Sequence, residues 1–308
     1  MKSVTVIINP VAGNGRALKK WQNLQPSLPE ATVYYSEYPR HAVSIAKNLV
    51  KEKIARLVIV IGGDGTVHEV IEGTKGAPWI EVVAVSAGSG NDFGRTFTTV
   101  DSLEDIQDFV ETSAPVKQMR IGRMHTSPKE MVFINNSGYG FDAKVVYEAN
   151  QSIWKKRLNR FGLGKVVYYG LVVRELVTYQ PTSLQLKVDD ENHTFHDVWF
   201  VVVCNQAYFG GGMKISPHSN PEDDFLEATV VSGISRWKLL VLFGTVFLGW
   251  HTKLAAVKQF SGTRFELTTS APLIGHADGE YSGQLLPGDV AVATLYQETW
   301  AMPIQSER

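Results

Sequence analysis

Short apolar runs alternate with helical patterns of apolar and polar positions from the N-terminus to Pro115. A short apolar run is typical of a buried strand, while apolar residues spaced three or four apart predict a helix. We expect strands at Val4–Ile8, Ala31–Tyr35, Leu57–Ile61 and Glu81–Val85, and helices at Ala17–Leu24, His41–Glu52, Thr66–Glu72 and Ser102–Glu111. Strands that alternate with helices favour a parallel sheet covered by helices. The first domain is therefore predicted to be α/β.

Beyond Pro115 the pattern changes to runs rich in valine, threonine and aromatic residues, separated by turn residues. MVFINNSGYGF, SLQLKVDD and FLEATVVSG are examples, and their composition favours strands. We expect a β-rich second domain of mostly antiparallel, sandwich-like sheet. The predicted boundaries are residues 1–118 for the α/β domain and 119–291 for the β-rich domain, with a tail of about residues 292–308 packing back on the first.

Composition narrows the partners and the compartment. The 308 residues include 30 Lys and Arg against 31 Asp and Glu, so the net charge of −1 provides no general attraction to nucleic acid. The single cysteine, Cys204, excludes a disulfide framework and a Cys-rich zinc site, and it fits a reducing compartment. The apolar run Val4–Ile8 is too short for a signal peptide. We expect a cytoplasmic protein that does not bind nucleic acid.

Glycine-rich segments follow three of the predicted strands. They are NPVAGNG at Asn9–Gly15, GGDGT at Gly62–Thr66 and SAGSGNDFGR at Ser86–Arg95. Ligands of open parallel sheets bind outside the carboxyl ends of the strands, where glycine lets backbone amides and helix N-termini approach an anion. The sequence therefore predicts a nucleotide phosphate site, with Asp64 and Asp92 able to reach the metal that accompanies ATP. The predicted nucleotide-binding residues are Asn9, Gly13, Gly15, Gly62, Gly63, Asp64, Gly65, Thr66, Glu69, Gly88, Ser89, Asn91 and Asp92.

Other interpretations of these patterns carry less weight. GNG alone is an ordinary tight turn, and GSGNDFG has the spacing GxGxxxG rather than that of a dinucleotide fingerprint. No GxxxxGK[ST] loop occurs. His193 and His196 form HxxH without a nearby third ligand, which favours a surface pair over a metal site. For His41 and His68, nucleotide contact and a packing role both stay open.

Six ordered motifs resemble the soluble diacylglycerol kinase and sphingosine kinase superfamily, in its bacterial lipid-kinase branch. NPVAGNG resembles the opening NPxxGxG, GGDGTVHEV the signature GGDGTxxEV, and AGSGNDFGR the segment PxGTxNDFAR. GYGFDAKVV, GGGMKISPHS and HADGEYSG resemble three later segments. NAD kinases share GGDGT, so the GGGM and late DGE segments are what favour the lipid branch.

The resemblance implies an ATP site on the glycine loops, a lipid pocket in the β-rich domain, and catalysis in a cleft. By position, Asp278 is similar to the family's catalytic base, which accepts the proton of the lipid hydroxyl, and Glu280 to its supporting carboxylate. Phosphoryl transfer does rely on positioning, a metal and such a carboxylate. The alternative for Asp-Gly followed by Glu is an ordinary hairpin turn.

Some residues depart from the family pattern. Ser86 and Ala87 replace a proline region, and Ser89 replaces a threonine but keeps a hydroxyl. The resemblance implies an auxiliary Mg²⁺ at PEDDFLEA, where Asp223 matches the family's aspartate and Asp224 replaces its glycine. The metal-binding candidates are thus Asp223, Asp224 and, with the nucleotide, Asp64. A solvated acidic turn is the alternative for the first two.

Two segments bear on membrane contact. Basic and aromatic residues alternate from Trp154 to Arg174, including Lys155, Lys156 and Arg157, which suits either a transient membrane-surface contact or a solvated helix face. The run Leu239–Trp250 would span only about 18 Å as a helix, against about 30 Å for a bilayer core. It suits a buried helix, or else the wall of an acyl-chain pocket.

These observations predict an ATP- and Mg²⁺-dependent kinase that phosphorylates a hydroxyl of diacylglycerol or a related long-chain lipid. The alternatives are a kinase of the same fold with a soluble acceptor, similar to NAD kinase, and a nucleotide-binding regulator without turnover. The residues do not decide which lipid is used, and a homodimer stays open as the oligomeric state.

Overall fold

The computed structural model describes residues 2–88, 90–100, 102–111, 115–152 and 164–304. The chain divides into two compact units. The first unit comprises Met1–Ile121, Gly210–Gly212 and Tyr296–Arg308, and the second comprises Gly122–Phe209 and Met213–Leu295.

The first unit is built on a sheet whose strand order is β2-β1-β3-β4-β17-β5. Neighbours from β2 to β17 run parallel, while β5 is antiparallel to β17. The glycine-rich segments that follow β1, β3 and β4 therefore all begin at the carboxyl ends of parallel strands, on the same side of the sheet. The strands are β1 (Val4–Ile8), β2 (Thr32–Tyr35), β3 (Leu57–Gly62), β4 (Glu81–Ser86), β5 (Val116–Met119) and β17 (Trp300–Pro303).

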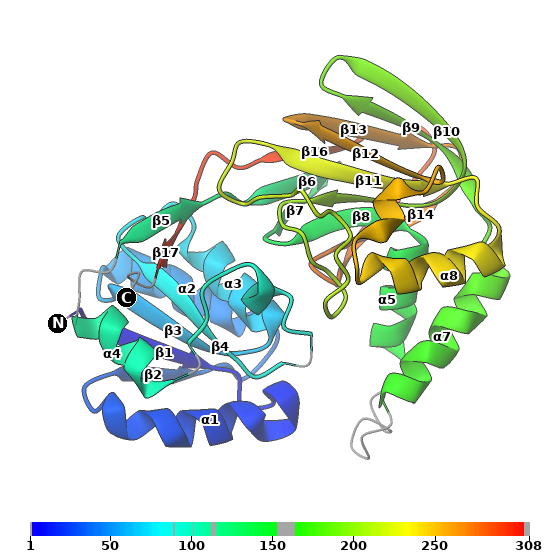
Figure 1. Ribbon diagram of the computed structural model, residues 1–308. Coiled ribbons are helices and arrows are strands. Elements are labelled where there is room, and N and C mark those ends of the chain that lie inside the picture. The colour runs from blue at the N-terminus through cyan, green and yellow to red at the C-terminus, as the bar shows by residue number, and fades with distance from the viewer. Residues whose placement is uncertain (1, 89, 101, 112–114, 153–163, 305–308) are drawn as a thin grey trace. The chain divides into compact units, whose positions relative to one another are not determined.

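Helices cover both faces of this sheet. Figure 1 shows α1 and α4 in front of the strands and α2 and α3 behind them. Leu57, Ile59 and Ile61 pack with Trp21 and Phe109 on the α1 and α4 side, and the intervening residues of β3 are equally buried. A parallel strand covered on both faces must be apolar throughout. The helices of this unit are α1 (Arg16–Leu24), α2 (His41–Glu52), α3 (Asp64–Thr74) and α4 (Leu103–Glu111), with short 3-10 helices η1 (Ala12–Gly15), η2 (Gln25–Ser27) and η3 (Phe93–Arg95).

The second unit is built on a large antiparallel sheet. Its main path is β15-β14-β8-β10-β9-β13-β16-β6-β7, and β11 and β12 branch from β10. The strands are β6 (Gly122–Thr126), β7 (Lys129–Phe133), β8 (Asn136–Gly140), β9 (Thr182–Val188), β10 (Glu191–Cys204), β11 (Leu226–Ser232), β12 (Val257–Gly262), β13 (Arg264–Thr269), β14 (Leu273–Ala277), β15 (Glu280–Leu285) and β16 (Ala291–Leu295).

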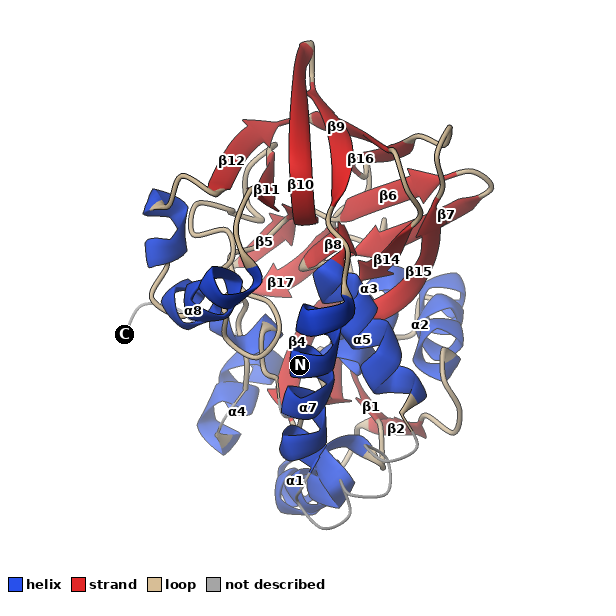
Figure 2. Ribbon diagram, turned by 90° about the vertical axis from the view of Figure 1, so that its right-hand side faces the viewer, coloured by secondary structure: helices blue, strands red, loops and turns tan. Residues whose placement is uncertain are grey.

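Two apolar cores lie on opposite faces of this second sheet. Along β10, Val201 and Val203 enter one core, while Phe200, Val202 and Cys204 enter the other. Helices α5, α7 and α8 supply the second core, and Figure 2 shows them on one side of the strands. They are α5 (Phe141–Gln151), α7 (Gly164–Thr178) and α8 (Arg236–Val246), and a short 3-10 helix, η4 (Trp250–Lys253), follows α8.

The fold class predicted from the sequence is confirmed: a parallel α/β unit and an antiparallel β-rich unit are both present. Residues 154–163 of the predicted basic segment, including Lys155, Lys156 and Arg157, lie outside the described residues. None of the helices in the described ranges is both long enough and apolar enough to cross a membrane.

Candidate active site

Three glycine-rich loops of the first unit are tied to one another at the carboxyl edge of its sheet. Asn9, which follows β1, donates its side-chain amide to Thr66 Oγ1 at 3.0 Å. The backbone amide of Ala87 donates to the carbonyl of Gly62 at 2.7 Å. The loops after β1, β3 and β4 therefore form one assembly rather than three separate turns.

Gly13 and Arg16 hold the first loop against the third. Gly13 has a φ of 60°, and a Cβ there would lie 2.0 Å from the carbonyl oxygen of Ala87, so no larger residue fits. Arg16 donates from Nε to the Gly13 carbonyl at 3.1 Å and from Nη2 to the Gly88 carbonyl at 3.3 Å. A backbone packed this closely presents main-chain groups, rather than side chains, to a ligand.

Asp64 opens α3 and joins the second loop to the third. Its carboxylate accepts the backbone amides of Asp92 at 3.4 Å and Phe93 at 3.2 Å. A carboxylate in the first turn also complements the positive end of the helix dipole. Gly65, next to it, is exposed, and an added Cβ would meet no described atom within 4 Å.

Asp92 is the buried carboxylate of this assembly. It accepts the backbone amides of Gly211 at 2.8 Å and Gly212 at 2.7 Å, and the segment Gly210–Gly212 belongs to the first unit. Burial and the nearby charge of Asp64 raise the pKa of Asp92 in spite of these amides. Proteins commonly bind Mg²⁺ through one or two carboxylates together with substrate phosphates, and the role predicted for Asp64 and Asp92 at such an ion stays a prediction.

The remaining predicted nucleotide residues divide by position. Asn91 has a φ of 54° and lies within hydrogen-bonding distance of the Ser86 hydroxyl. Ser89 lies outside the described residues. Gly15, which precedes α1, has a φ of 87° that favours glycine, and Gly63 packs its backbone against that of Gly88.

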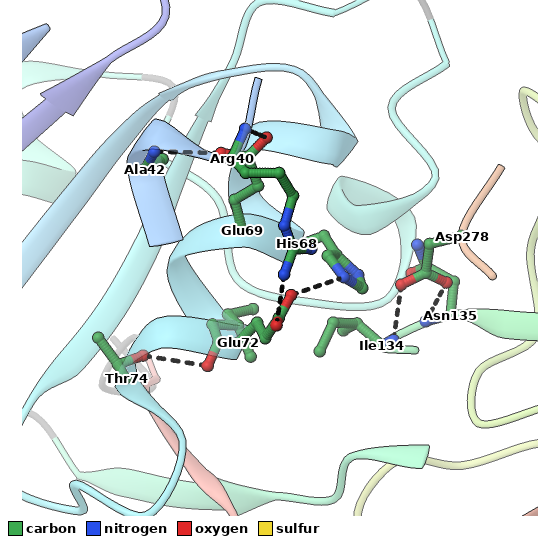
Figure 3. A network of polar contacts seen from close by, with 10 residues as sticks. Arg40, Ala42, His68, Glu69, Glu72, Thr74, Ile134, Asn135 and Asp278 are labelled. Atoms are coloured by element: carbon green, nitrogen blue, oxygen red, sulfur yellow. Dashed lines mark hydrogen bonds and ion pairs between the residues drawn. The ribbon is translucent and has the colours of Figure 1, made fainter. Parts of the chain in front are cut away.

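Glu69 faces the start of α2. Its carboxylate accepts the amides of Arg40 at 3.0 Å and Ala42 at 3.1 Å, so it satisfies amides that the helix itself cannot. Figure 3 shows this contact on α3, with Glu72 placed between Arg40 and His68. The structure thus shows a helix-capping role for Glu69, and its predicted role in nucleotide binding stays a prediction.

Glu72 was not singled out by the sequence analysis. Its Oε1 accepts a hydrogen bond from Arg40 Nη2 at 2.7 Å, and its Oε2 lies 3.6 Å from His68 Nε2. Burial acts to raise the pKa of Glu72, but the hydrogen bonds and positive charges of His68 and Arg40 outweigh burial and lower the pKa to about 2.

In the second unit, Asp278 occupies the two-residue turn between β14 and β15. Asp278 and Gly279 have φ values of 47° and 81°, as a type I′ hairpin requires. The carboxylate accepts the amides of Ile134 at 2.6 Å, Asn135 at 2.9 Å and Asn136 at 2.9 Å. Figure 3 shows the carboxylate facing the first two of these. The residue is both a hairpin turn and a carboxylate of fixed orientation.

A buried polar network supports the backbone that holds Asp278. Asn205 donates its side-chain amide to the Ile134 carbonyl at 2.9 Å, and Gln206 donates to Asn135 Oδ1 at 3.0 Å. Both Asn205 and Gln206 are buried. Sequence reasoning missed them, although polar residues directly after an apolar strand such as WFVVVC were the available signal.

A second buried pair was also missed. His276, two residues before Asp278, approaches Asp142 Oδ2 with Nε2 at 2.9 Å, and both side chains are buried. The Ser137 hydroxyl donates to the His276 carbonyl at 2.7 Å. These contacts join α5, β8 and β14 behind the Asp278 turn.

The other predicted carboxylates are more exposed. Glu280 begins β15 with an exposed side chain. Asp223 Oδ1 accepts the Phe225 amide at 3.0 Å within a turn, and Asp224 beside it is exposed. No cluster of three or more His, Cys, Asp or Glu side chains suited to a metal ion occurs among the described residues.

Comparison with known proteins gives the family. Residues 3–124 match the diacylglycerol kinase catalytic domain, and residues 135–294 match the YegS C-terminal NAD kinase beta sandwich-like domain. YtlR of Bacillus subtilis (strain 168), whose name describes it as a lipid kinase, is 32% identical, with 90% of this chain and 93% of YtlR covered. The chain belongs to the diacylglycerol kinase family.

Other members of this lipid kinase family match the chain over similar lengths. A diacylglycerol kinase of Mycobacterium tuberculosis (strain ATCC 25618 / H37Rv) is 28% identical, with 94% of this chain and 91% of that protein covered. The crystal structure of a diacylglycerol kinase from Bacillus anthracis str. Sterne has a TM-score of 0.69 at 17% identity, covering 99% of this chain and 97% of that one. The family resemblance drawn from the six motifs is therefore confirmed.

Proposed function

We propose that the protein is an ATP-dependent lipid kinase that transfers the γ-phosphoryl group to a hydroxyl of diacylglycerol or a related long-chain lipid. The observation that carries the proposal is the joined set of three glycine-rich loops, held together by Asn9, Arg16 and Asp64, in a chain of the diacylglycerol kinase family. The names of the relatives, diacylglycerol kinase and lipid kinase, favour a lipid acceptor over NAD.

In this proposal the backbone amides of the loops and the N-terminus of α3 bind the phosphate groups. Asn9 and Thr66 supply neutral hydrogen bonds beside them. Asp64 and Asp92 are the residues that would hold Mg²⁺, which supplies positive charge to the phosphates during transfer. Asp223 and Asp224 stay candidates for an auxiliary ion.

Asp278 is the proposed general base. As the lipid hydroxyl oxygen bonds to the γ-phosphorus, Asp278 accepts its proton, and the bond from that phosphorus to the β,γ-bridging oxygen breaks to release ADP. The three amides that hold the carboxylate fix its orientation, as a base of this kind needs. Glu280 is the proposed supporting carboxylate.

An acceptor panel tests the proposal. The purified protein is incubated with labelled ATP and Mg²⁺, and with diacylglycerol in mixed micelles, with sphingosine, with NAD, or with no acceptor. We expect labelled phospholipid with diacylglycerol or another long-chain lipid. Phosphorylation of NAD alone would replace the lipid acceptor by a soluble one, and ATP binding without any product would favour a regulator.

Asp278→Asn tests the base. We expect turnover to fall by about 10² to 10⁴, with the ATP dissociation constant unchanged, because asparagine keeps the positive φ of the turn but cannot take the proton. Melting temperature checks that the turn survives the change. The matched control is Asp189→Asn, which also alters a carboxylate that accepts backbone amides but lies at another turn. Unchanged turnover in Asp278→Asn would remove Asp278 from this role.

A further inference from the structure

The second unit carries an apolar surface that its own fold leaves exposed. Helix α8 carries apolar residues on all sides, although Lys238 is an exposed cation on it. Leu239, Leu242 and Val246 are buried in the core shared with α5 and α7. On the remaining side, Trp237 and Val241 are each 71% exposed. A helix that is apolar all round is normally buried on every side, either in a protein core or in lipid. The protein core covers one side of α8. No described residue covers the other side.

This exposed side continues past the end of the helix. Leu248 is 61% exposed and Trp250, at the start of η4, is 60% exposed, and η4 packs against α8. Figure 1 shows α8 next to α7 in the second unit. Contiguous exposed apolar surface of this kind marks an interaction site. We define the α8 surface as Trp237, Leu240, Val241, Phe247, Leu248 and Trp250.

The charge around the α8 surface is of one sign. Residues 228–265 contain neither Asp nor Glu, although the whole chain has 31. Lys238 and Lys253 are exposed beside the apolar side chains. Arg236 is already used by the fold, since its Nη1 donates to the carbonyls of Leu176 at 2.8 Å and Tyr179 at 2.7 Å at the end of α7. The stretch that carries the apolar surface thus adds cations and no acids, and no ion pair of Lys238 or Lys253 occurs among the described residues.

We infer that the α8 surface inserts into one leaflet of an anionic membrane, with the helix lying in the plane of the interface. Exposed tryptophans near lysines are typical of the headgroup region, where the ring is buried and the charge meets lipid phosphate. At 11 residues α8 is about 17 Å long, which suits such a position and cannot cross a bilayer. The inference rests on the proposed function, because a lipid acceptor is what requires contact with a bilayer.

A second copy of the chain is a less suitable occupant of this surface. A symmetric dimer through the α8 surface would bring the same patch of both copies together, and with it Lys238 and Lys253 of each. Like charges at an interface are unfavourable. An anionic lipid surface instead provides both the apolar layer and the negative charge. The side of α8 already packed on the core holds the helix in shape before it meets the membrane.

Vesicle cosedimentation tests the inference directly. The full-length protein is mixed with phosphatidylcholine vesicles that contain or lack phosphatidylglycerol, at low and high salt. We expect binding to the anionic vesicles, and we expect Val241→Asp and Phe247→Ser to reduce it by at least about tenfold. Lys253→Glu should reduce binding at least about fivefold, which corresponds to about 1 kcal/mol per cation near such a surface.

Matched controls separate the α8 surface from general surface effects. Val290→Ser changes an exposed apolar residue outside α8 in the same unit, and Lys51→Glu changes an exposed lysine of α2. Both should bind vesicles as the wild type does. Lipids with brominated acyl chains should quench the tryptophan fluorescence of the wild type more than that of Trp237→Phe or Trp250→Phe. Vesicle binding that is equal in the wild type and Val241→Asp would overturn the inference.

Activity assays keep this inference distinct from the proposed function. With short-chain diacylglycerol below its micelle concentration, Val241→Asp should turn over as the wild type does, whereas its activity on diacylglycerol within vesicles should fall at least about tenfold. Equal loss on both substrates would instead make α8 part of the acyl-chain pocket and would overturn membrane insertion. A wild type that binds vesicles but phosphorylates no lipid would refute the proposed function alone. A dimer dissociated by Val241→Asp, with no vesicle binding in the wild type, would assign the surface to a second copy.

Discussion

Two glycines of the glycine-rich loops illustrate different reasons for the same residue. Gly13 is required by packing, because its φ is 60° and a Cβ would lie 2.0 Å from the Ala87 carbonyl oxygen. Gly65 lies in α3 with open space around the Cβ position, so neither packing nor backbone conformation requires glycine there. Glycine is unfavourable within a helix. We infer that Gly65 is kept for the close approach of a phosphate.

Gly65→Ala is therefore expected to stabilise the fold and weaken nucleotide binding together. The free energy of unfolding should rise by about 0.5 to 1 kcal/mol, while the ATP dissociation constant rises at least about tenfold, or about 1.4 kcal/mol. Gly13→Ala is the comparison, and its unfolding free energy should fall by about 1 to 3 kcal/mol. Thermal unfolding and calorimetric ATP titration measure both quantities. An ATP affinity that is unchanged in Gly65→Ala would contradict this role.

At the residue scale the sequence predicts best where a motif and a backbone conformation agree. The Asp-Gly turn, the alternative given for DGE, is present and agrees with the positive φ of Asp278, while its role as a base stays a prediction. The amides that hold its carboxylate come from residues more than a hundred positions earlier. Asn205 and Gln206, which support those amides, belong to a third segment. Pairings of this kind depend on strand register, which a single sequence does not specify.

Among the secondary-structure elements, an ion pair connects α3 to the start of α2. Glu72 on α3 is held by Arg40 at the start of α2 and by His68 one turn earlier on α3. Its pKa is lowered from 4.5 to about 2 in the folded protein. A carboxyl with a lowered pKa stabilises the fold above its unfolded pKa, and this contribution is lost as the pH falls through the folded pKa.

The contribution of Glu72 should therefore disappear between about pH 4.5 and pH 2. Glu72→Gln is expected to lower the unfolding free energy at pH 7 by about 1 to 3 kcal/mol, and to match the wild type more closely as the pH falls through that range. Denaturant unfolding at several pH values measures the difference. Glu52→Gln, at the exposed end of α2, is the control. A difference between Glu72→Gln and wild type that is independent of pH would contradict the ion pair.

Whole elements were predicted more successfully than the surfaces they expose. The boundaries predicted for Val4–Ile8 and His41–Glu52 agree with β1 and α2, because apolar periodicity and turn residues coincide at both ends. The run Leu239–Trp250 was expected to pack in a core or line a pocket, and only one side of α8 is buried. An apolar pattern indicates that a side chain avoids water, but not whether protein or lipid covers it.

At the scale of the whole molecule, the chain passes between its two units more than once. Gly210–Gly212 belongs to the first unit, although Phe209 and Met213 on either side belong to the second and pair with each other. The amides of Gly211 and Gly212 donate to Asp92, which belongs to the third glycine-rich loop. Nothing in the sequence GGG indicates this partner, which lies over a hundred residues earlier. The local stability of the segment should follow that of the first unit.

Hydrogen exchange with mass spectrometry tests this dependence. Hydrogen bonds to a charged group contribute about 1.5 to 3 kcal/mol each, so Asp92→Ala should accelerate exchange at Gly211 and Gly212 at least about tenfold. ATP at about 100 times its dissociation constant adds about 2.7 kcal/mol to the unit that binds it, and it should slow exchange at these glycines in the wild type but not in the variant. Asp189→Ala is the control, since Asp189 accepts the amides of Thr263 and Arg264 in the second unit. It should accelerate exchange at those two residues and leave Gly211 unaffected, because Asp189 bonds to Thr263 and Arg264 rather than to Gly211 or Gly212. Equal protection of Gly211 in wild type and Asp92→Ala would show that another contact holds this segment.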